Sequence, residues 1–309
     1  MISLVGTTAL VTDSTAHLQP GVVEACGVTV VPLQVVIDDE VHDEGSAEAT
    51  PERVAAALRE KRAVSTSRPA PTVFSDLYER LAAEGASSIL SVHLSAEVSG
   101  TFESALVASR TAPVPVTCVD TRQVGVATGY AVESAFAVLS SGGTVAEAAA
   151  AARERATTAT SLFYVNTLEY LRRGGRVGTA AAVFGGVLAV KPLLGIVDGV
   201  IAPRAKVRTA AKAIAQLEAM AVEAAGEHPV EVCVAHLAAE ERALALADRL
   251  AEQLGERLVP GRDGDPVRCL ELGGVLGAHV GPGMLAICVA PVLGSSDASS
   301  GSSSDPADA

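Results

Sequence analysis

The sequence has 309 residues, 49% of them apolar and 19% charged, which is enough material for two packed domains at roughly 150 residues each. A net charge of −13 argues against nucleic-acid and anionic-membrane partners, and an aromatic content of 3% argues against base stacking. The five cysteines form no CxxC pair and no basic leader opens the chain, so we expect reduced cysteines and a cytoplasmic protein.

The first half of the chain alternates between strand and helix patterns. Expected strands are Ala9–Thr12, Val28–Val31, Gln34–Ile37, Ser88–His93 and Val114–Val119. Expected helices are Pro51–Arg62, Pro71–Glu84, a helix from the Ser99–Thr101 turn to Arg110, Val124–Ser140 and Val145–Ala156. This alternation predicts a parallel sheet with helices on both faces. Ligands bind at the carboxyl edge of such a sheet, where Asp13–Thr15, Ser95–Thr101 and Asp120–Thr121 would lie.

Hydroxyl groups are the first candidates for a binding site. Thr66 and Ser67 fall in the stretch Ser65–Pro69, which reads as a polar loop. Ser99 and Gly100 open a helix, where backbone N–H groups and the helix dipole favour an anion. An ordinary loop and a plain helix cap remain the structural alternatives for these residues.

The second half predicts a mixed α/β domain after a polar hinge at Thr157–Thr160. We therefore expect an N-terminal domain over 1–158, a C-terminal domain over 159–294 and a disordered tail over 295–309. Expected strands are Ser161–Val165, Val230–His236, Arg268–Leu272 and Met284–Val289, with a hairpin at Asp198–Gly199. Expected helices are Leu168–Arg173, Thr179–Val190, Ala210–Ala225 and Ala239–Leu254.

The stretch from Asn166 to Arg208 combines three features that suit a ligand with an anionic head and an apolar body. Arg176 follows two glycines, and Arg208, with Lys206 and Thr209, opens a helix. Small residues between them leave room for an apolar tail, namely Ala180–Ala182, Gly185, Gly186 and Ala189. Capping of helix carbonyls by Arg176 and close helix packing of the small residues are the alternatives.

Motifs that are missing exclude several functions. The chain has no P-loop, no HExxH, no Cys/His metal spacing and no GxSxG elbow, so we expect no metal site and no ATP binding of its own. The most apolar segment is broken by Lys191 and Pro192, which argues against membrane insertion. His279 lies in a turn rich in glycine and proline, Gly277–Gly283, rather than on an apolar face.

Six short segments, in this order and spacing, carry a family resemblance. They are TDST at Thr12–Thr15, TSRP at Thr66–Pro69, SGT at Ser99–Thr101, LEYLRRGGRV at Leu168–Val177, KP at Lys191–Pro192 with VRT at Val207–Thr209, and GAHVGPG at Gly277–Gly283. Together they resemble the DegV family of fatty-acid-binding proteins, which includes the lipid-carrying subunit of bacterial fatty acid kinase. The resemblance covers all but the C-terminal tail. Departures are Arg68, where the family usually has glutamine, Glu97 near the SGT turn, and Met284–Ala286.

The resemblance implies a carrier rather than an enzyme. A long-chain fatty acid would lie in a tunnel between the two α/β domains, with its carboxylate at Thr66, Ser99 and His279 and with Ser67 and Gly100 beside them. Arg176 and Arg208 would face the partner or the acyl phosphate. A separate ATP-dependent kinase subunit would phosphorylate the bound acid, so no catalytic residue and no cofactor are expected in this chain.

Two other interpretations remain at this point. Ser99 as nucleophile with His279 as base would make a serine-dependent ester hydrolase, although no acid partner is assigned. A regulatory or structural protein with an empty tunnel is the other. For the carrier, a charged His279 would strengthen the hold on a carboxylate, and we expect binding to weaken at high pH.

Overall fold

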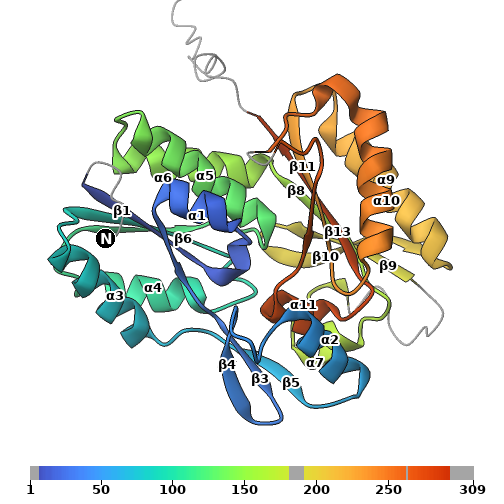
Figure 1. Ribbon diagram of the computed structural model, residues 1–309, viewed down its shortest axis with the longest axis horizontal. Coiled ribbons are helices and arrows are strands. Elements are labelled where there is room, and N and C mark those ends of the chain that lie inside the picture. The colour runs from blue at the N-terminus through green and yellow to red at the C-terminus, as the bar shows by residue number, and fades with distance from the viewer. Residues whose placement is uncertain (1–6, 181–190, 262–263, 293–309) are drawn as a thin grey trace, which may run out of the picture.

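The computed structural model describes residues 7–180, 191–261 and 264–292, and the chain forms an α/β protein with a parallel sheet in its N-terminal half and a mixed sheet in its C-terminal half (Figure 1). This is the expected fold class. Among the described residues, no helix is both long and apolar enough to cross a membrane. The helix expected at Thr179–Val190 and the tail over 295–309 lie largely or wholly outside the described residues.

The N-terminal sheet has the order β2-β1-β6-β7, and every neighbouring pair is parallel. Its strands are β1 (Thr8–Asp13), β2 (Val28–Val31), β6 (Ser88–His93) and β7 (Val116–Asp120). Alternate side chains point to opposite faces, so Leu10 and Leu90 enter one core while Val11 and Ile89 enter the other. The first core is covered by α1 (Pro20–Cys26), α5 (Val126–Ser140) and α6 (Val145–Thr158), and the second by α3 (Pro71–Ala83) and α4 (Thr101–Ser109).

A small antiparallel sheet of order β4-β3-β5 projects from this half (Figure 1). It consists of β3 (Gln34–Ile37), β4 (Glu40–Asp43) and β5 (Val64–Ser67), with α2 (Pro51–Arg59) beside it. The polar loop expected at Ser65–Pro69 was therefore wrong in part, because backbone pairing with β3 makes Ser65–Ser67 a strand. Its alternating burial lets Thr66 face inward.

The C-terminal sheet has the order β10-β9-β8-β13-β11-β12 and is antiparallel except for the β11/β12 pair. Its strands are β8 (Thr160–Tyr164), β9 (Lys191–Val197), β10 (Val200–Val207), β11 (Val230–His236), β12 (Arg268–Glu271) and β13 (Leu285–Pro291). The Asp198–Gly199 hairpin is confirmed, with φ of 50° and 85° at its two turn residues. Lys206 lies in β10, so only Thr209 caps the next helix.

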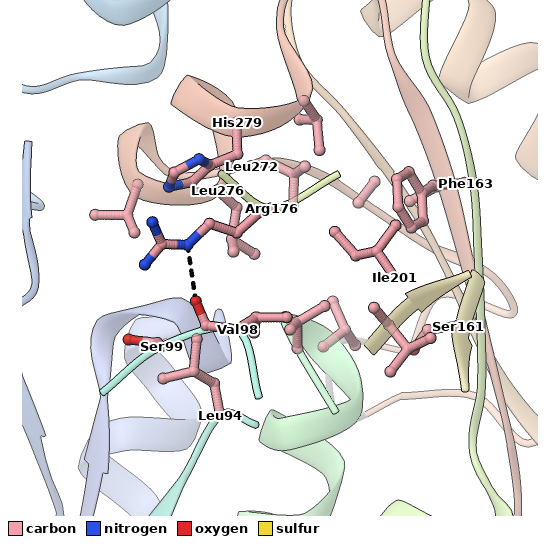
Figure 2. A pocket seen from close by; sticks show the side chains of 18 of the residues that line it. Leu94, Val98, Ser99, Ser161, Phe163, Arg176, Ile201, Leu272, Leu276 and His279 are labelled. Carbon is pink, nitrogen blue, oxygen red and sulfur yellow. Dashed lines mark hydrogen bonds between the residues drawn. The ribbon is translucent and has the colours of Figure 1, made fainter. Parts of the chain in front are cut away.

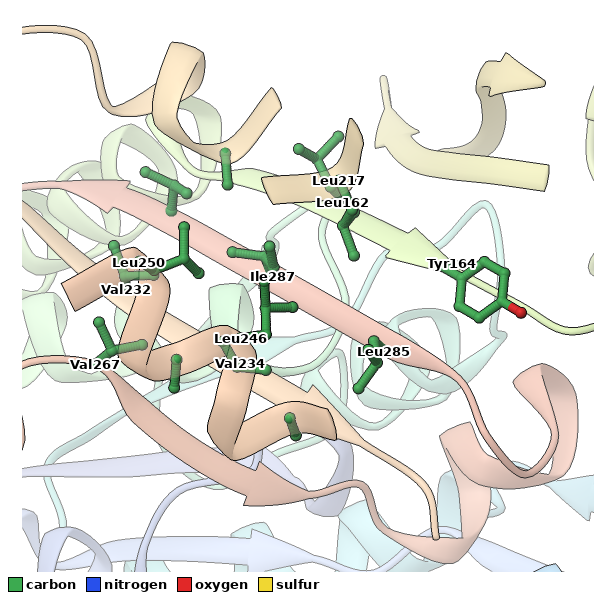
Figure 3. Packing of buried hydrophobic residues seen from close by; sticks show 14 of the residues in the cluster. Leu162, Tyr164, Leu217, Val232, Val234, Leu246, Leu250, Val267, Leu285 and Ile287 are labelled. Atoms are coloured by element: carbon green, nitrogen blue, oxygen red, sulfur yellow. The ribbon is translucent and has the colours of Figure 1, made fainter. Parts of the chain in front are cut away.

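The two faces of this second sheet have different neighbours. Leu162, Val232 and Ile287 point outward and pack under α9 (Ala210–Ala225) and α10 (Glu240–Leu254), as Figure 3 shows. The opposite face turns toward the N-terminal half, where Cys233 and Cys288 pack with residues at the start of α5. An interior space between the halves therefore has this inward face as one wall.

Short elements complete the fold. They are the 3-10 turns η1 (Ser14–Ala16) and η2 (Gly255–Arg257), and the helices α7 (Glu169–Arg173) and α11 (Gly274–Val280). The turn expected at Gly277–Gly283 was wrong, because its first four residues finish α11 and only Gly281 and Gly283 then take φ of 74° and 84°. Within the polar hinge expected at Thr157–Thr160, only Ala159 lies outside a helix or strand, since α6 runs to Thr158 and β8 begins at Thr160, and the domain boundary placed there stays a prediction.

Candidate functional site

A cavity of about 440 Å³ lies between the two halves of the molecule. This volume falls in the range of small-molecule sites, roughly 300–1,000 Å³. The N-terminal half lines it with Leu94 after β6 and with the loops that lead into α4 and α5, and the C-terminal half lines it with the inward face of its sheet, α7 and α11. No acidic residue is among the described residues that line the cavity.

One end of the cavity is polar and the other is apolar (Figure 2). His279, Arg176 and Ser99 gather on one side, while Phe163 and Ile201 lie on the other. Further apolar lining comes from many elements and includes Leu33, Leu171, Ala235, Leu272, Leu276, Met284 and Ala286. Such a division suits an elongated ligand with one charged end.

Three of the expected head-group residues meet at the polar end. Thr66 Oγ1 and His279 Nε2 share a hydrogen bond of 2.8 Å, although 213 positions separate them in the chain. Ser99 Oγ lies 2.9 Å from Thr101 Oγ1 and accepts a hydrogen bond from the Thr101 N–H. Ser67 and Gly100 also line the cavity, and Ser67 Oγ donates to the Arg68 carbonyl. The structure thus brings all five together.

Two glycines make room for the large side chains at this end. A Cβ added to Gly174 would lie 2.1 Å from His279 Nδ1, and one added to Gly100 would lie 1.8 Å from Arg68 Nη1. Because such contacts are far below van der Waals distance, the absence of a side chain at these positions lets the imidazole and the guanidinium lie against the backbone.

The His279 imidazole is uncharged at neutral pH. Burial lowers the pKa of His279 to about 4, and the neighbouring Arg176 guanidinium adds to this lowering. At neutral pH the ring is thus uncharged because it is desolvated, and the expected weakening of carboxylate binding at high pH stays a prediction. Its buried Nδ1 has no hydrogen-bond partner within the described residues.

The two arginines expected at the site have different positions. Arg176 lines the cavity, where its Nε donates to the Val98 carbonyl at 2.9 Å and its Nη1 donates to the Gly174 carbonyl at 2.6 Å (Figure 2). It therefore caps the end of α7 and also reaches across to the N-terminal half. Arg208 is exposed after β10 and does not line the cavity.

The contacts of Ser99 and His279 argue against a catalytic pair. His279 Nε2 is engaged by Thr66, and no hydrogen bond joins it to Ser99 within the described residues. A pKa of about 4 also makes the imidazole a weak general base at neutral pH. Nor do three His, Cys, Asp or Glu side chains gather as a metal site among the residues described.

Glu44, which sequence patterns did not single out, anchors the helix that carries His279. Its Oε1 accepts a hydrogen bond of 2.8 Å from the Val275 N–H in the first turn of α11, and its Oε2 accepts one of 2.5 Å from Ser14 Oγ. Desolvation raises the pKa of Glu44, and the hydrogen bond from Ser14 opposes that shift. Because 231 positions separate Glu44 from Val275, no local pattern in the sequence could have indicated this contact.

The tail end of the cavity was also not predicted by residue. Phe163, Cys233 and Cys288 belong to strands whose alternation reveals an inward face, but the sequence does not show what faces them. The wall of small residues at 180–189 lies outside the described residues except for Ala180, which is fully buried.

Known proteins match this chain along nearly its whole length. The model of the family described as "Uncharacterised protein, DegV family" matches residues 7–292. A DegV domain-containing protein of Streptomyces coelicolor is 50% identical over 281 residues, which cover 91% of this chain and 97% of that protein. Another from Halalkalibacterium halodurans is 34% identical, with 90% of this chain and 96% of that protein covered.

Solved structures of related proteins share the fold. That of a DegV family protein from Thermus thermophilus, presented as a study of its fatty acid binding, superposes with a TM-score of 0.81 at 30% identity and covers 93% of this chain and 100% of that chain. That of DegV from Bacillus subtilis, named a fatty acid binding protein, has a TM-score of 0.81 at 29% identity and covers 93% and 99%.

Proposed function

The chain belongs to the DegV family, and on that premise we propose that it binds a long-chain fatty acid between its two halves and presents the carboxylate to a separate ATP-dependent kinase. The observation that carries this proposal is a cavity with an apolar body and one polar end, where Thr66, Ser99 and His279 meet. These three would hold the carboxylate, with Ser67 and the Gly100 backbone at its edge.

The acyl chain would supply most of the affinity. Each buried methylene contributes about 0.8 kcal/mol, so roughly fifteen of them offer on the order of 12 kcal/mol before the costs of association. A hydrogen bond to a charged group adds only about 1.5–3 kcal/mol. The polar end therefore sets the register and direction of the ligand, which is what a carrier needs in order to expose one end to a partner.

We further propose that the halves 1–158 and 159–294 act as the two domains that enclose the ligand. The chain would supply no catalytic residue and need no cofactor, because the kinase subunit brings the ATP and forms the acyl phosphate. Arg176 at the cavity and Arg208 on the surface would face that partner or the phosphate. The lack of an acidic side chain among the described lining residues supports an anionic ligand.

Native mass spectrometry of the purified protein, followed by denaturing extraction, tests the binding proposal. We expect a stoichiometric fatty acid that is lost in a Thr66→Ala/Ser99→Ala double variant. A Ser109→Ala/Thr111→Ala variant is the matched control, because it removes the same groups at the far end of α4, outside the cavity. A protein that is empty and takes up no added fatty acid would contradict the proposal.

The presentation to a kinase needs its own test. With ATP, a fatty acid kinase subunit and hydroxylamine as a trap, we expect a fatty acyl hydroxamate only when both proteins are present. Treatment with an organophosphonate separates the hydrolase alternative, since an activated serine would form a covalent adduct. An adduct at Ser99 would overturn the assignment of that residue to the carboxylate.

A further inference from the structure

Two guanidinium groups hold the segment that carries Ser99. Arg68, just after β5, donates from Nη1 to the Gly100 carbonyl at 3.2 Å. Arg176, after α7, donates from Nε to the Val98 carbonyl at 2.9 Å. Ser99 is the middle residue of this three-residue segment, and both arginines line the cavity. A ligand head that reaches Ser99 therefore lies between two cations from opposite walls.

Glycine at position 100 leaves room for the exposed Arg68 guanidinium to approach the backbone beside Ser99. The guanidinium lies so close to Gly100 that an added Cβ would be 1.8 Å from Nη1 and 2.7 Å from Cζ. A side chain at position 100 would displace this guanidinium, which is the far end of an exposed side chain. Arg68 forms just one hydrogen bond through its guanidinium within the described residues, so its other N–H groups are available to a ligand.

The charges around these two arginines are not balanced by the protein. Over residues 7–180, 191–261 and 264–292, neither arginine forms an ion pair with a carboxylate, and no acidic residue lines the cavity. Glu97 lines an adjoining hollow with Arg176, where its Cγ approaches Gly199 in the β9–β10 turn. His279 adds no charge, because its pKa is lowered to about 4. The head-group end thus carries two permanent positive charges.

We propose that Arg68 is a specificity-determining residue that makes this end favour a dianionic head, a long-chain phosphate monoester or acyl phosphate, over the carboxylate of a fatty acid with the same tail. One carboxylate neutralises only one of the two guanidinium groups, whereas a phosphate dianion neutralises both and has three oxygens to accept their N–H groups. This inference rests on the proposed fatty-acid binding, because it assumes that the tail occupies the cavity.

Competition between palmitate and hexadecyl phosphate tests the inference on the delipidated full chain at about pH 8, where the phosphate, with a second pKa of about 6, is dianionic. The ratio of the two affinities cancels any general effect of a variant on tail binding. We expect the wild type to favour the phosphate. Because Arg68 is exposed, we expect Arg68→Gln to reduce that preference by roughly fivefold rather than more. Arg68→Lys, which keeps the charge, should retain more of it than Arg68→Gln.

An Arg80→Gln variant, which removes an exposed cation from α3 away from the cavity, should leave the ratio unchanged. An unchanged ratio in Arg68→Gln, with both ligands still bound, would overturn the role of Arg68 and leave the proposed function standing. A wild type that favours palmitate would likewise overturn it. Failure of both ligands to bind the wild type would overturn the proposed function and this inference together.

Discussion

Gly174→Ala should weaken ligand binding without unfolding the protein. The backbone at Gly174 has φ of −74°, which alanine adopts freely, so the change itself introduces no backbone strain. The new Cβ would, however, lie 2.1 Å from His279 Nδ1 and 2.7 Å from Cε1. The imidazole must therefore move by about 1 Å to reach an acceptable contact, and its 2.8 Å hydrogen bond with Thr66 would be lost or distorted.

The magnitudes separate binding from stability. Replacing glycine by alanine stabilises by about 0.4–1 kcal/mol through the unfolded state, and losing one hydrogen bond costs about 0.5–1.5 kcal/mol, so the free energy of unfolding should change by less than about 1 kcal/mol. A displaced head-group donor costs the ligand about 1.4 kcal/mol or more, which is roughly tenfold in affinity. The substitution thus acts on the site far more than on the fold.

Displacement of a fluorescent fatty acid and urea unfolding measure the two quantities for Gly174→Ala. The control is Gly21→Ala, which also adds a methyl group within or next to a short helix but meets nothing within 4 Å. We expect the control to bind like the wild type. Wild-type affinity in Gly174→Ala would refute the reasoning that His279 must lie against Gly174 to hold the ligand.

Three further predictions address the other groups of the site. The pKa of His279 is lowered to about 4 in the folded protein, so between pH 6.5 and 4 the unfolded chain binds a proton that the folded protein does not. As the pH falls through that window, this residue should lower the free energy of unfolding by at most about 3 kcal/mol. Equal pH slopes in urea titrations of wild type and His279→Gln would contradict this. Glu44→Gln places an amide, with a donor in place of one acceptor oxygen, against Ser14 and the α11 N-terminus. We expect the free energy of unfolding in denaturant to fall by about 1–3 kcal/mol and the fatty-acid affinity to weaken. An unaltered affinity would show that Glu44 does not support the site. Of the two arginines only Arg176 lines the cavity, so Arg176→Ala should lower the fatty-acid affinity. Arg208→Ala should preserve that affinity and lower only hydroxamate formation with the kinase. Reduced fatty-acid binding in Arg208→Ala would refute this division of roles.

The sequence predicted those elements whose stability comes from their own pattern. β2, β3, β6, α9 and β11 begin and end where apolar periodicity and capping residues place them. β4 and β5 were missed, because they are short, largely exposed and held by backbone pairing to β3 rather than by an apolar face. Tertiary pairing of this kind leaves no periodic signal in the strand that it stabilises.

The sequence indicated which side chains are candidates for the site, but not how they are arranged in space. Thr66, Ser99 and His279 stand out because hydroxyl and imidazole groups occur next to glycine or proline in short motifs. The sequence did not reveal that α11 carries His279, since two glycines in seven residues give a weak helix signal. Nor did it reveal that burial beside Arg176 would neutralise the imidazole, because a pKa shift depends on neighbours brought close by folding.

The Thr12–Thr15 motif acts on the site by positioning rather than by contact. Asp13 Oδ2 accepts hydrogen bonds from the Leu94 N–H at 3.1 Å and lies 3.0 Å from His93 Nδ1, while His93 Nε2 lies 2.7 Å from Ser91 Oγ. Serine, histidine and aspartate stand here in the order of a hydrolytic triad, yet all three side chains are fully buried and no substrate can reach the serine. What this buried chain of hydrogen bonds fixes is the carboxyl end of β6, where Leu94 turns into the cavity wall and the chain continues to Ser99. The motif therefore positions a wall of the cavity that it does not itself line.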